Sequence, residues 1–255
     1  MPDTKPVTAA LILIGNELLS GRTQDTNLHT IANALSAHGI RLTEARVIAD
    51  VSTVIQATVN TLRAQCDYVF TTGGIGPTHD DITAENVAAA FGVPLIEHPE
   101  ARDRLLEYFR ERGTEPNEAR MRMARTPQGA TLVDNPVSVA PGFCIGNVYV
   151  MAGVPRIMTA MLENILPTLR HGSRVLSASV MCNLPEGELA APLAEIQARY
   201  PSTDIGSYPG KSEGGYRVNL IARSEHRDVL AAIEKDIESM IDSLGGDVLE
   251  KKPIQ

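Results

Sequence analysis

Apolar residues in the first two thirds of the chain follow two alternating patterns. Short continuous apolar runs, typical of buried strands, alternate with stretches whose apolar residues recur at helical spacing, as Leu28, Ile31 and Leu35 do. From residue 7 to about residue 170, this alternation predicts a mostly parallel sheet with helices on both faces. The expected strands are residues 8–14, 41–49, 68–70, 131–133 and 148–151, and the expected helices lie near residues 28–35, 54–62, 84–91, 100–112, 114–125 and 156–169.

The pattern changes after His171 and Gly172. The remainder predicts a strand at 174–181, a helix at 186–199, strands at 203–208 and 216–222, a helix at 225–244 and a last strand at 247–249. We therefore expect two domains, an α/β domain at residues 1–172 and a smaller α+β domain at residues 173–255. This order is typical of nucleic-acid-binding modules with a Gly-x-x-Gly clamp, but three residues separate Gly210 from Gly214. Acidic residues outnumber basic ones there, so no nucleic-acid role is predicted.

Charge and cysteine content narrow the class of protein. The chain has a net charge of −8 and no run of basic residues, so we expect neither nucleic acid nor an anionic membrane as a partner. The apolar run at residues 9–14 is too short to span a bilayer and is interpreted as a first strand, not a signal peptide. Cys66, Cys144 and Cys182 show no zinc spacing, which favours reduced thiols in a cytoplasmic protein.

A glycine-rich segment from Thr71 to Thr83 carries the main chemical signal. It follows an apolar run, precedes an Ala-rich helical stretch, and reads Thr-Thr-Gly-Gly-Ile-Gly-Pro-Thr-His-Asp-Asp-Ile-Thr. Glycines allow turns and close approaches that other residues resist, and we expect Thr83 to be the N-cap of the following helix. A turn that presents backbone N–H groups beside a helix N-terminus suits a phosphate group. The segment lacks the Lys-[Ser/Thr] ending of a P-loop and the glycine spacing of a dinucleotide-binding turn.

Two aspartates follow the glycines, and their charge points to a bound cation. Asp80 and Asp81 would repel a phosphate unless a cation lay between them. We therefore predict a divalent ion (Mg, Mn or Co) held by Asp81 and Asp80. The alternative is a tight turn with two solvated aspartates. The coincidence of glycines, a proline, two carboxylates and a threonine after one strand favours the functional interpretation.

Four loops are expected to meet at the carboxyl ends of the parallel strands, where open α/β sheets bind ligands. They begin at residues 15, 50, 73 and 153, so Glu17, Asp50, Asp80 and Asp81 are candidates to face one crevice. Asp81 and Asp50 are the preferred catalytic residues. A charge placed favourably at a helix N-terminus is the alternative for Asp50, and a partly exposed loop carboxylate is the alternative for Glu17. The predicted phosphate- or ligand-binding residues are Gly15, Glu17, Asn27, Thr72, Gly73, Gly74, Gly76, Pro77, Thr78, Thr83, Gly153 and Pro155.

Other chemistry-bearing residues form no pattern that we assign to a site. No Ser-His-Asp or Cys-His arrangement is detectable, which counts against acyl transfer. Met121 and Met123 are interpreted as packing residues and not as part of a cofactor site.

Several motifs together resemble the N-terminal region of the competence/damage-inducible protein A (CinA) family, within the wider molybdopterin-binding (MoaB/Mog-like) superfamily. The motifs are Gly15-Asn16-Glu17-Leu18-Leu19-Ser20-Gly21 with Thr26-Asn27, the glycine-rich segment at residues 72–83, Ala140-Pro141-Gly142-Phe143, and Gly153-Val154-Pro155. The resemblance implies a three-layer α/β/α fold, homo-oligomeric assembly, for which we favour a dimer, and a KH-like module as the smaller domain. CinA proteins often continue into a nicotinamide-nucleotide deamidase domain, and this chain stops before one, so that activity is expected to be absent.

The family implies two kinds of activity. Some members and relatives are metal-dependent pyrophosphatases that act on ADP-ribose or FAD, whereas the molybdopterin branch binds or adenylylates the pterin with aspartates that match Asp50 and Asp81. Our leading expectation is therefore divalent-metal-dependent hydrolysis of a nucleotide pyrophosphate. The alternative is a protein that binds molybdopterin or a related pterin phosphate without hydrolysing it. A third hypothesis is a purely structural scaffold, and the intact acidic pair counts against it.

Overall fold

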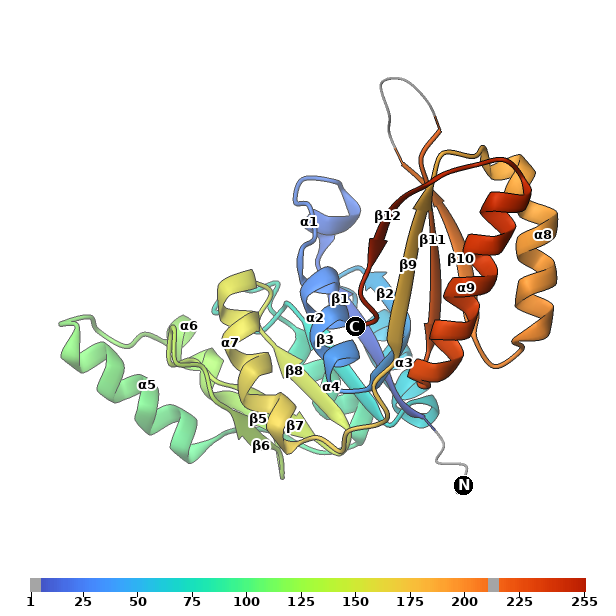
Figure 1. Cartoon of the computed structure of the whole chain (residues 1–255). Coiled ribbons are helices and arrows are strands. Elements are labelled where there is room, and N and C mark those ends of the chain that lie inside the picture. The colour runs from blue at the N-terminus through green and yellow to red at the C-terminus, as the bar shows by residue number, and fades with distance from the viewer. Residues whose placement is uncertain (1–5, 211–215) are drawn as a thin grey trace. The chain divides into compact units, whose positions relative to one another are not determined.

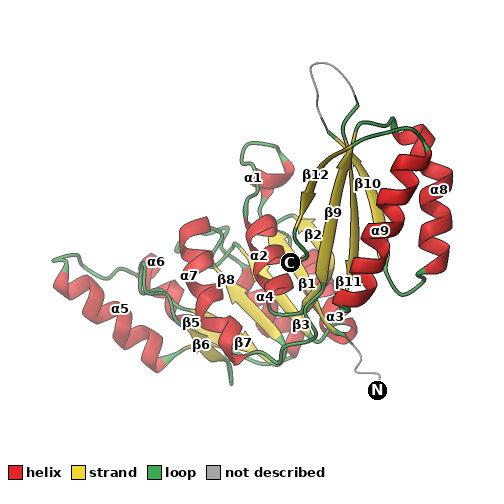
Figure 2. Ribbon diagram, in the orientation of Figure 1, coloured by secondary structure: helices red, strands yellow, loops and turns green. Residues whose placement is uncertain are grey.

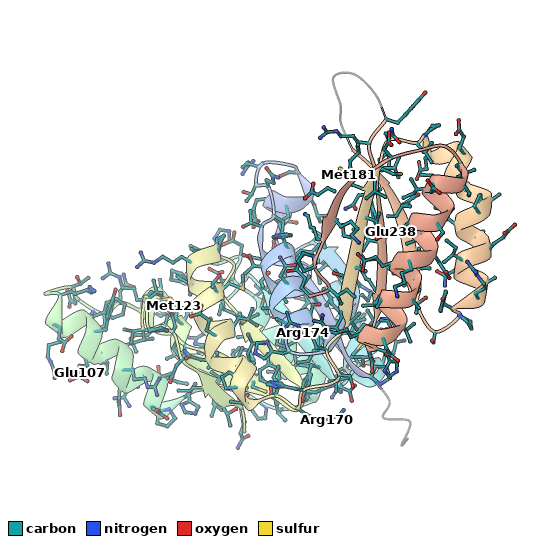
Figure 3. All side chains as sticks on the ribbon, in the orientation of Figure 1. Glu107, Met123, Arg170, Arg174, Met181 and Glu238 are labelled. Carbon is teal, nitrogen blue, oxygen red and sulfur yellow. The ribbon has the colours of Figure 1, made fainter. Side chains whose placement is uncertain are left out.

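The computed structural model describes residues 6–210 and 216–255, and the chain divides into two compact units, residues 1–172 and 173–255 (Figure 1). The connection between the units lies between Arg170 and Arg174, which are labelled in Figure 3. Residues 211–215, which contain most of the clamp-like glycine segment, lie outside the described residues. In the part of the chain that is described, no helix is both long and apolar enough to cross a bilayer.

A six-stranded sheet with the order β2-β1-β3-β8-β7-β6 forms the centre of the first unit. Its neighbouring strands β2, β1, β3 and β8 run parallel, whereas β7 is antiparallel to both β8 and β6. Parallel neighbours need long crossover connections, which the amphipathic helices provide. The strands are β1 (Val7–Ile14), β2 (Ile40–Ile48), β3 (Tyr68–Thr72), β6 (Thr131–Val133), β7 (Gly142–Ile145) and β8 (Val148–Met151).

Helices cover both faces of this sheet (Figure 2). Successive side chains of a strand point to opposite faces. Leu11 and Leu13 of β1 therefore pack with α2 and α7, whereas Ile12 and Ile14 pack with α3 and α4. Burial on both faces explains why β1 is a continuous apolar run, and it confirms the predicted parallel sheet with two helical layers. The helices are α1 (Asn16–Leu19), α2 (Asn27–Ala37), α3 (Ser52–Gln65), α4 (Thr83–Phe91) and α7 (Pro155–Ile165).

An arm between α4 and β6 has a small hydrophobic core of its own. Its ends are held by the antiparallel pair β4 (Leu95–Glu97) and β5 (Arg125–Pro127). Between these strands the chain forms α5 (Pro99–Glu111) and α6 (Glu118–Met121). The buried residues of the arm are Ala101, Leu105, Phe109 and Ala124, and the side chains packed against them include Met121 and Met123. The interpretation of the two methionines as packing residues is therefore confirmed.

The helix predicted at residues 114–125 is much shorter in the structure. The side chain of Asn117 accepts a hydrogen bond from the Arg120 N–H and caps α6, so the helix cannot begin earlier. A 3₁₀ turn, Arg122–Ala124, follows α6, and the chain then becomes extended to pair with β4. Strands β4, β5 and β7 were not predicted, because Glu97, Arg125, Pro127 and Gly142 interrupt their short apolar patterns. Strands β6 and β8 are equally short, but their β-branched and apolar residues indicated them.

The second unit is a four-stranded antiparallel sheet, in the order β10-β11-β9-β12, with two helices. Alternate residues of β9 and β11, among them Ala178, Val180 and Leu220, form one core with apolar residues of both helices. The predicted smaller α+β domain is therefore confirmed, with all six elements in the predicted order. They are β9 (Leu176–Cys182), α8 (Glu186–Arg199), β10 (Asp204–Pro209), β11 (Val218–Ser224), α9 (Arg227–Ser243) and β12 (Val248–Lys252).

Candidate phosphate and cation site

Loops from four parallel strands meet at one edge of the large sheet and are joined by hydrogen bonds. Between the loops after β1 and β2, the Asn16 N–H donates to Asp50 Oδ2 at 2.8 Å. The Gly73 N–H, after β3, donates to the Met151 carbonyl at the end of β8 (3.1 Å). Asn27, at the start of α2, donates from Nδ2 to the Gly153 carbonyl at 2.8 Å. The predicted convergence of these loops is therefore present, and the bond from Asn27 to Gly153 joins the loops after β1 and β8 past the intervening β3.

Glycine is required where these loops touch. Gly73 has φ of +99°, and a Cβ atom there would lie 2.2 Å from the Ile14 carbonyl oxygen. Gly74 has φ of +68°, and its Cβ would lie 2.1 Å from Thr83 Oγ1. A Cβ on Gly153 would lie 3.2 Å from the Cα of Gly73. Backbone therefore packs directly on backbone at this edge, which is the close approach that the sequence motif predicts.

Thr83 does not cap α4 as predicted. The N-cap is Ile82, and Thr83 is the first helical residue and is completely buried. Its hydroxyl donates to the Gly73 carbonyl at 3.0 Å and its N–H donates to the Gly74 carbonyl at 2.9 Å. Thr83 cannot cap the helix because the glycine turn folds back onto it, and the carbonyls of this turn accept hydrogen bonds from both the hydroxyl and the N–H of Thr83. Thr83 thus fixes the turn, and Thr72 before it is also buried.

The two aspartates of the motif lie in different environments. Asp81 Oδ2 accepts hydrogen bonds from the N–H (2.8 Å) and the hydroxyl (2.6 Å) of Thr78. A Cβ on Gly76 would lie 2.6 Å from the same carboxylate oxygen, so only glycine leaves room for it. Asp80 is exposed, and its pKa lies below the ordinary value, chiefly through the Thr78 hydroxyl and then through its own backbone N–H. Asp80 is therefore charged at neutral pH, beside a carboxylate held in a fixed position.

The expected gathering of four carboxylates does not form a metal-binding group. Among the described residues, no three side chains of His, Cys, Asp or Glu come close enough to hold an ion together. Asp50 is engaged by the Asn16 N–H, and Glu17 is exposed on α1. The strands that precede Asp50 and the glycine loop both pair with β1, which separates their ends by about 10 Å. Asp80 and Asp81 remain, and two carboxylates suffice for an ion that keeps waters and binds ligand phosphates.

A pocket opens beside the glycine loop, between α4 and the arm. The wall formed by the glycine loop and α4 includes Gly76, Asp81 and Glu85, the wall formed by the arm includes Arg122 and Arg125, and the rest of the lining is mostly apolar. Sequence reasoning assigned no role to these arginines. The only local signal is the alternation Arg-Met-Arg-Met-Ala-Arg at residues 120–125, and the pairing of β4 with β5 is what brings its last part to the pocket. Met123, labelled in Figure 3, also lines the pocket.

Asn27 offers a further polar group at the loop edge. Asn27 as a whole residue is 5% exposed, and its Nδ2 donates to the Gly153 carbonyl. Within the described residues its Oδ1 has no hydrogen-bond partner. A buried oxygen without a donor is costly unless a bound molecule or water supplies one. Gly15 is buried nearby, whereas Pro77 and Gly153 are exposed on the loops and Pro155 is exposed at the start of α7.

Both units match families of known proteins. Residues 10–171 match the family described as "Probable molybdopterin binding domain", and residues 174–245 match "FAD synthase, middle domain". A protein of Aeropyrum pernix is 34% identical in an alignment 260 residues long, and the alignment covers 95% of this chain and 97% of that one. A CinA-like protein of Desulfovibrio desulfuricans is 32% identical over 250 residues, covering 94% of this chain but 58% of the relative.

A solved structure agrees with the fold of the first unit. The protein CinA of Thermoplasma acidophilum, described as of unknown function, is 32% identical with a TM-score of 0.59, and the match covers 64% of this chain and 98% of that one. A CinA-like protein of Desulfosudis oleivorans is 36% identical over 211 residues, and the match covers 51% of its length, so the chain spans little more than half of the CinA-like relatives. With a family match over more than half of its length, the chain belongs to the molybdopterin-binding-domain (MoaB/Mog-like) family, and its homologues include CinA-like proteins.

Proposed function

We propose that the protein hydrolyses a nucleotide pyrophosphate with the help of a divalent cation, and that ADP-ribose and FAD are candidate substrates. The observation that carries the proposal is the fixed carboxylate of Asp81, held by Thr78 against Gly76 at the rim of a pocket, with the charged Asp80 next to it. This pair suits a cation, and the side-chain-free turn beside it suits a phosphate. The match of residues 174–245 to a family named for FAD synthase supports FAD as one candidate.

Several residues of the loop edge have a role in this proposal. Asp81 and Asp80 would hold the ion, and Thr78 keeps the Asp81 carboxylate in one orientation through two hydrogen bonds. A bound divalent ion stabilises charge on phosphate oxygens and lowers the pKa of a bound water. The half-buried backbone at Gly74 and Gly76 would position the phosphate. Asn27 secures the neighbouring Gly153 loop, so the edge does not have to reorganise when the ligand binds.

The test is AMP release from ADP-ribose or FAD by the purified protein with magnesium, manganese or cobalt. The Asp81→Asn variant keeps an oxygen that can accept the Thr78 N–H but loses the charge, and we expect its rate to fall by about 100-fold. Asp134→Asn is the matched control, because Asp134 is an exposed aspartate that pairs with Arg104 outside the pocket. No AMP release with any of the three ions would rule the proposal out, and an unaltered rate in Asp81→Asn would remove the role of Asp81.

A second candidate function is binding of molybdopterin or a related pterin phosphate without hydrolysis. The family match over residues 10–171 favours it, and so does the buried Asn27 Oδ1, which could accept a hydrogen bond from a heterocyclic N–H. Pterin phosphate binding that persists in chelator, together with no turnover of pyrophosphates, would select this candidate over the first.

A further inference from the structure

Seven arginines lie in the arm between β4 and the end of β5, and their pairing divides them into two groups. Five have partners: Arg102 pairs with Glu97, Arg104 with Glu100 and Asp134, Arg110 with Glu107, and Arg112 and Arg120 stack on Tyr108 and Phe109. Among the described residues, Arg122 and Arg125 form no ion pair, side-chain hydrogen bond or ring contact. These two are also the two that line the pocket.

The two pocket arginines are held in place by their backbone. Ala124 between them is completely buried in the core of the arm, and Arg125 is the first residue of β5, in register with Glu97 of β4. Arg122 is half-buried and Arg125 is exposed. Their guanidinium groups therefore extend from a fixed segment, at a wall where Met123 and Phe143 offer no acceptor.

The wall formed by the glycine loop and α4 bears the reverse charge. Asp81 and Glu85 line the same pocket as Arg122 and Arg125, and among the described residues no ion pair joins these two carboxylates to the two guanidinium groups. A single phosphoryl group at the glycine loop would meet the carboxylates and their cation and leave the arginines unused. A second phosphoryl group, linked to the first, can reach the arginine wall, where guanidinium groups bind phosphate in a bidentate manner.

We propose that Arg122 and Arg125 are specificity-determining residues that bind the second phosphoryl group, so that the pocket selects diphosphates over monophosphates. This inference rests on the proposed function, because it takes the glycine loop as the site of the first phosphoryl group. In this proposal the arm determines the class of substrate, and the glycine loop binds the cation. A ligand with two linked phosphoryl groups spans both walls.

Calorimetric titration of the full chain in the presence of magnesium tests the inference. The probes are adenosine 5′-(α,β-methylene)diphosphate, which resists hydrolysis, and AMP. We expect the wild-type protein to bind the diphosphate at least about tenfold more tightly. Arg122→Gln and Arg125→Gln should each weaken diphosphate binding by about tenfold and leave AMP binding unchanged. Arg120→Gln is the matched control, because Arg120 is committed to the Glu115 carbonyl and the Phe109 ring and lies outside the pocket.

The outcomes separate this inference from the proposed hydrolysis. If both pocket variants abolish the diphosphate preference but the protein releases no AMP from ADP-ribose with any metal, the inference stands and the hydrolytic function is ruled out. If the protein releases AMP but its Arg122→Gln and Arg125→Gln variants keep the diphosphate preference, only the inference is overturned. Circular dichroism checks that the variants fold, and Arg122→Lys, which keeps the charge but loses the bidentate geometry, should recover part of the affinity.

Discussion

Gly73 is the residue on which the loop edge depends most. Its positive φ and its contact with the Ile14 carbonyl join the ends of β1 and β3, while its N–H reaches the end of β8. Three strands are thus tied at one position that has no side chain. Gly92, the C-cap of α4, also has a positive φ (+67°), but a Cβ there would meet nothing within 4 Å. A comparison of substitutions at these two glycines therefore separates the cost of the backbone conformation from the cost of steric overlap.

We expect Gly73→Ala to destabilise the protein far more than Gly92→Ala does. At Gly92 the cost is the left-handed conformation alone, about 1 kcal/mol. At Gly73 the added methyl group must also displace the Ile14 carbonyl, which brings the cost to about 3 kcal/mol or more. Urea denaturation of both variants measures the difference. Equal losses would mean that the loop edge moves aside freely, and the packing described here would then be wrong.

Val139 is the one described residue other than glycine with a positive φ (+65°). A β-branched residue rarely adopts this conformation. Asn135 enforces it: its Oδ1 accepts from the N–H groups of Val137 and Ser138, and its Nδ2 donates to the Ala140 carbonyl. The turn leads directly into Pro141 and Phe143, which line the pocket. Backbone strain is therefore present two residues before the lining of the candidate site, and such strain often occurs near functional sites.

At the scale of elements, periodic segments were predictable and the paired strands of the arm were not. The helix expected at residues 186–199 has those bounds in the structure, because fourteen residues carry a clear amphipathic period. The glycine loop was also predictable, since its glycines and its proline indicate a turn of the local backbone. By contrast, the places of Arg122 and Arg125 depend on the pairing of β4 with β5, two three-residue strands almost thirty positions apart. No local pattern encodes such a contact.

The cap of α4 shows how tertiary contacts override a local rule. Thr83 has the residue type of an N-cap, but the Gly73 carbonyl lies within reach of its hydroxyl and takes it as a donor. The helix therefore begins one residue earlier than the threonine rule predicts. Asp80 and Asp81 illustrate the same limit, because adjacent carboxylates that read alike in the sequence differ in exposure and in hydrogen bonding.

Because strand β8 carries Tyr149, we expect the first unit to lose stability as the pH becomes alkaline. Tyr149 stacks on Phe70 at 5.5 Å, and burial, followed by the charge of Cys144, raises the pKa of its hydroxyl to about 12. Burial likewise raises the pKa of the Cys144 thiol, which is opposite Tyr149 in the β7–β8 pair. Both groups stay protonated in the folded chain at a pH where the unfolded chain has lost the proton. The contribution of these two groups to the free energy of unfolding is therefore complete below their pKa in the unfolded chain. It is lost as the pH rises through their pKa in the folded chain.

For Tyr149 this window runs from about pH 10 to about pH 12. We expect Tyr149→Phe to lose less stability between pH 9 and pH 11 than the wild-type protein does, because the variant has no phenol to ionise. Guanidinium denaturation at the two pH values, followed by circular dichroism, measures this. Tyr216→Phe, in the second unit, is the control and should behave as the wild type. The same alkaline loss in Tyr149→Phe would assign the effect to other groups.

At the scale of the whole molecule, each unit has hydrophobic cores of its own. Two core clusters lie on either side of the large sheet and a third belongs to the antiparallel sheet, and among the described strands no ladder joins the two sheets. The Thermoplasma CinA structure is matched over 98% of its length by 64% of this chain, so a fold like the first unit exists as a separate chain. All residues of the candidate pocket lie between positions 75 and 143, within that unit.

We therefore expect residues 1–172, expressed alone, to fold cooperatively and to bind the methylene diphosphate in preference to AMP, as the full chain should. The physical reason is that the sheet, its two helical layers and the arm that carries the arginines are all complete in this fragment. Thermal unfolding by circular dichroism tests the folding, and calorimetric titration with the two nucleotides tests the preference. A folded fragment without the preference would show that the second unit contributes to ligand binding, and an unfolded fragment would show that the two cores depend on each other. Either result would contradict the independence argued from the separate cores, whereas a folded and selective fragment would assign ligand choice to the first unit alone.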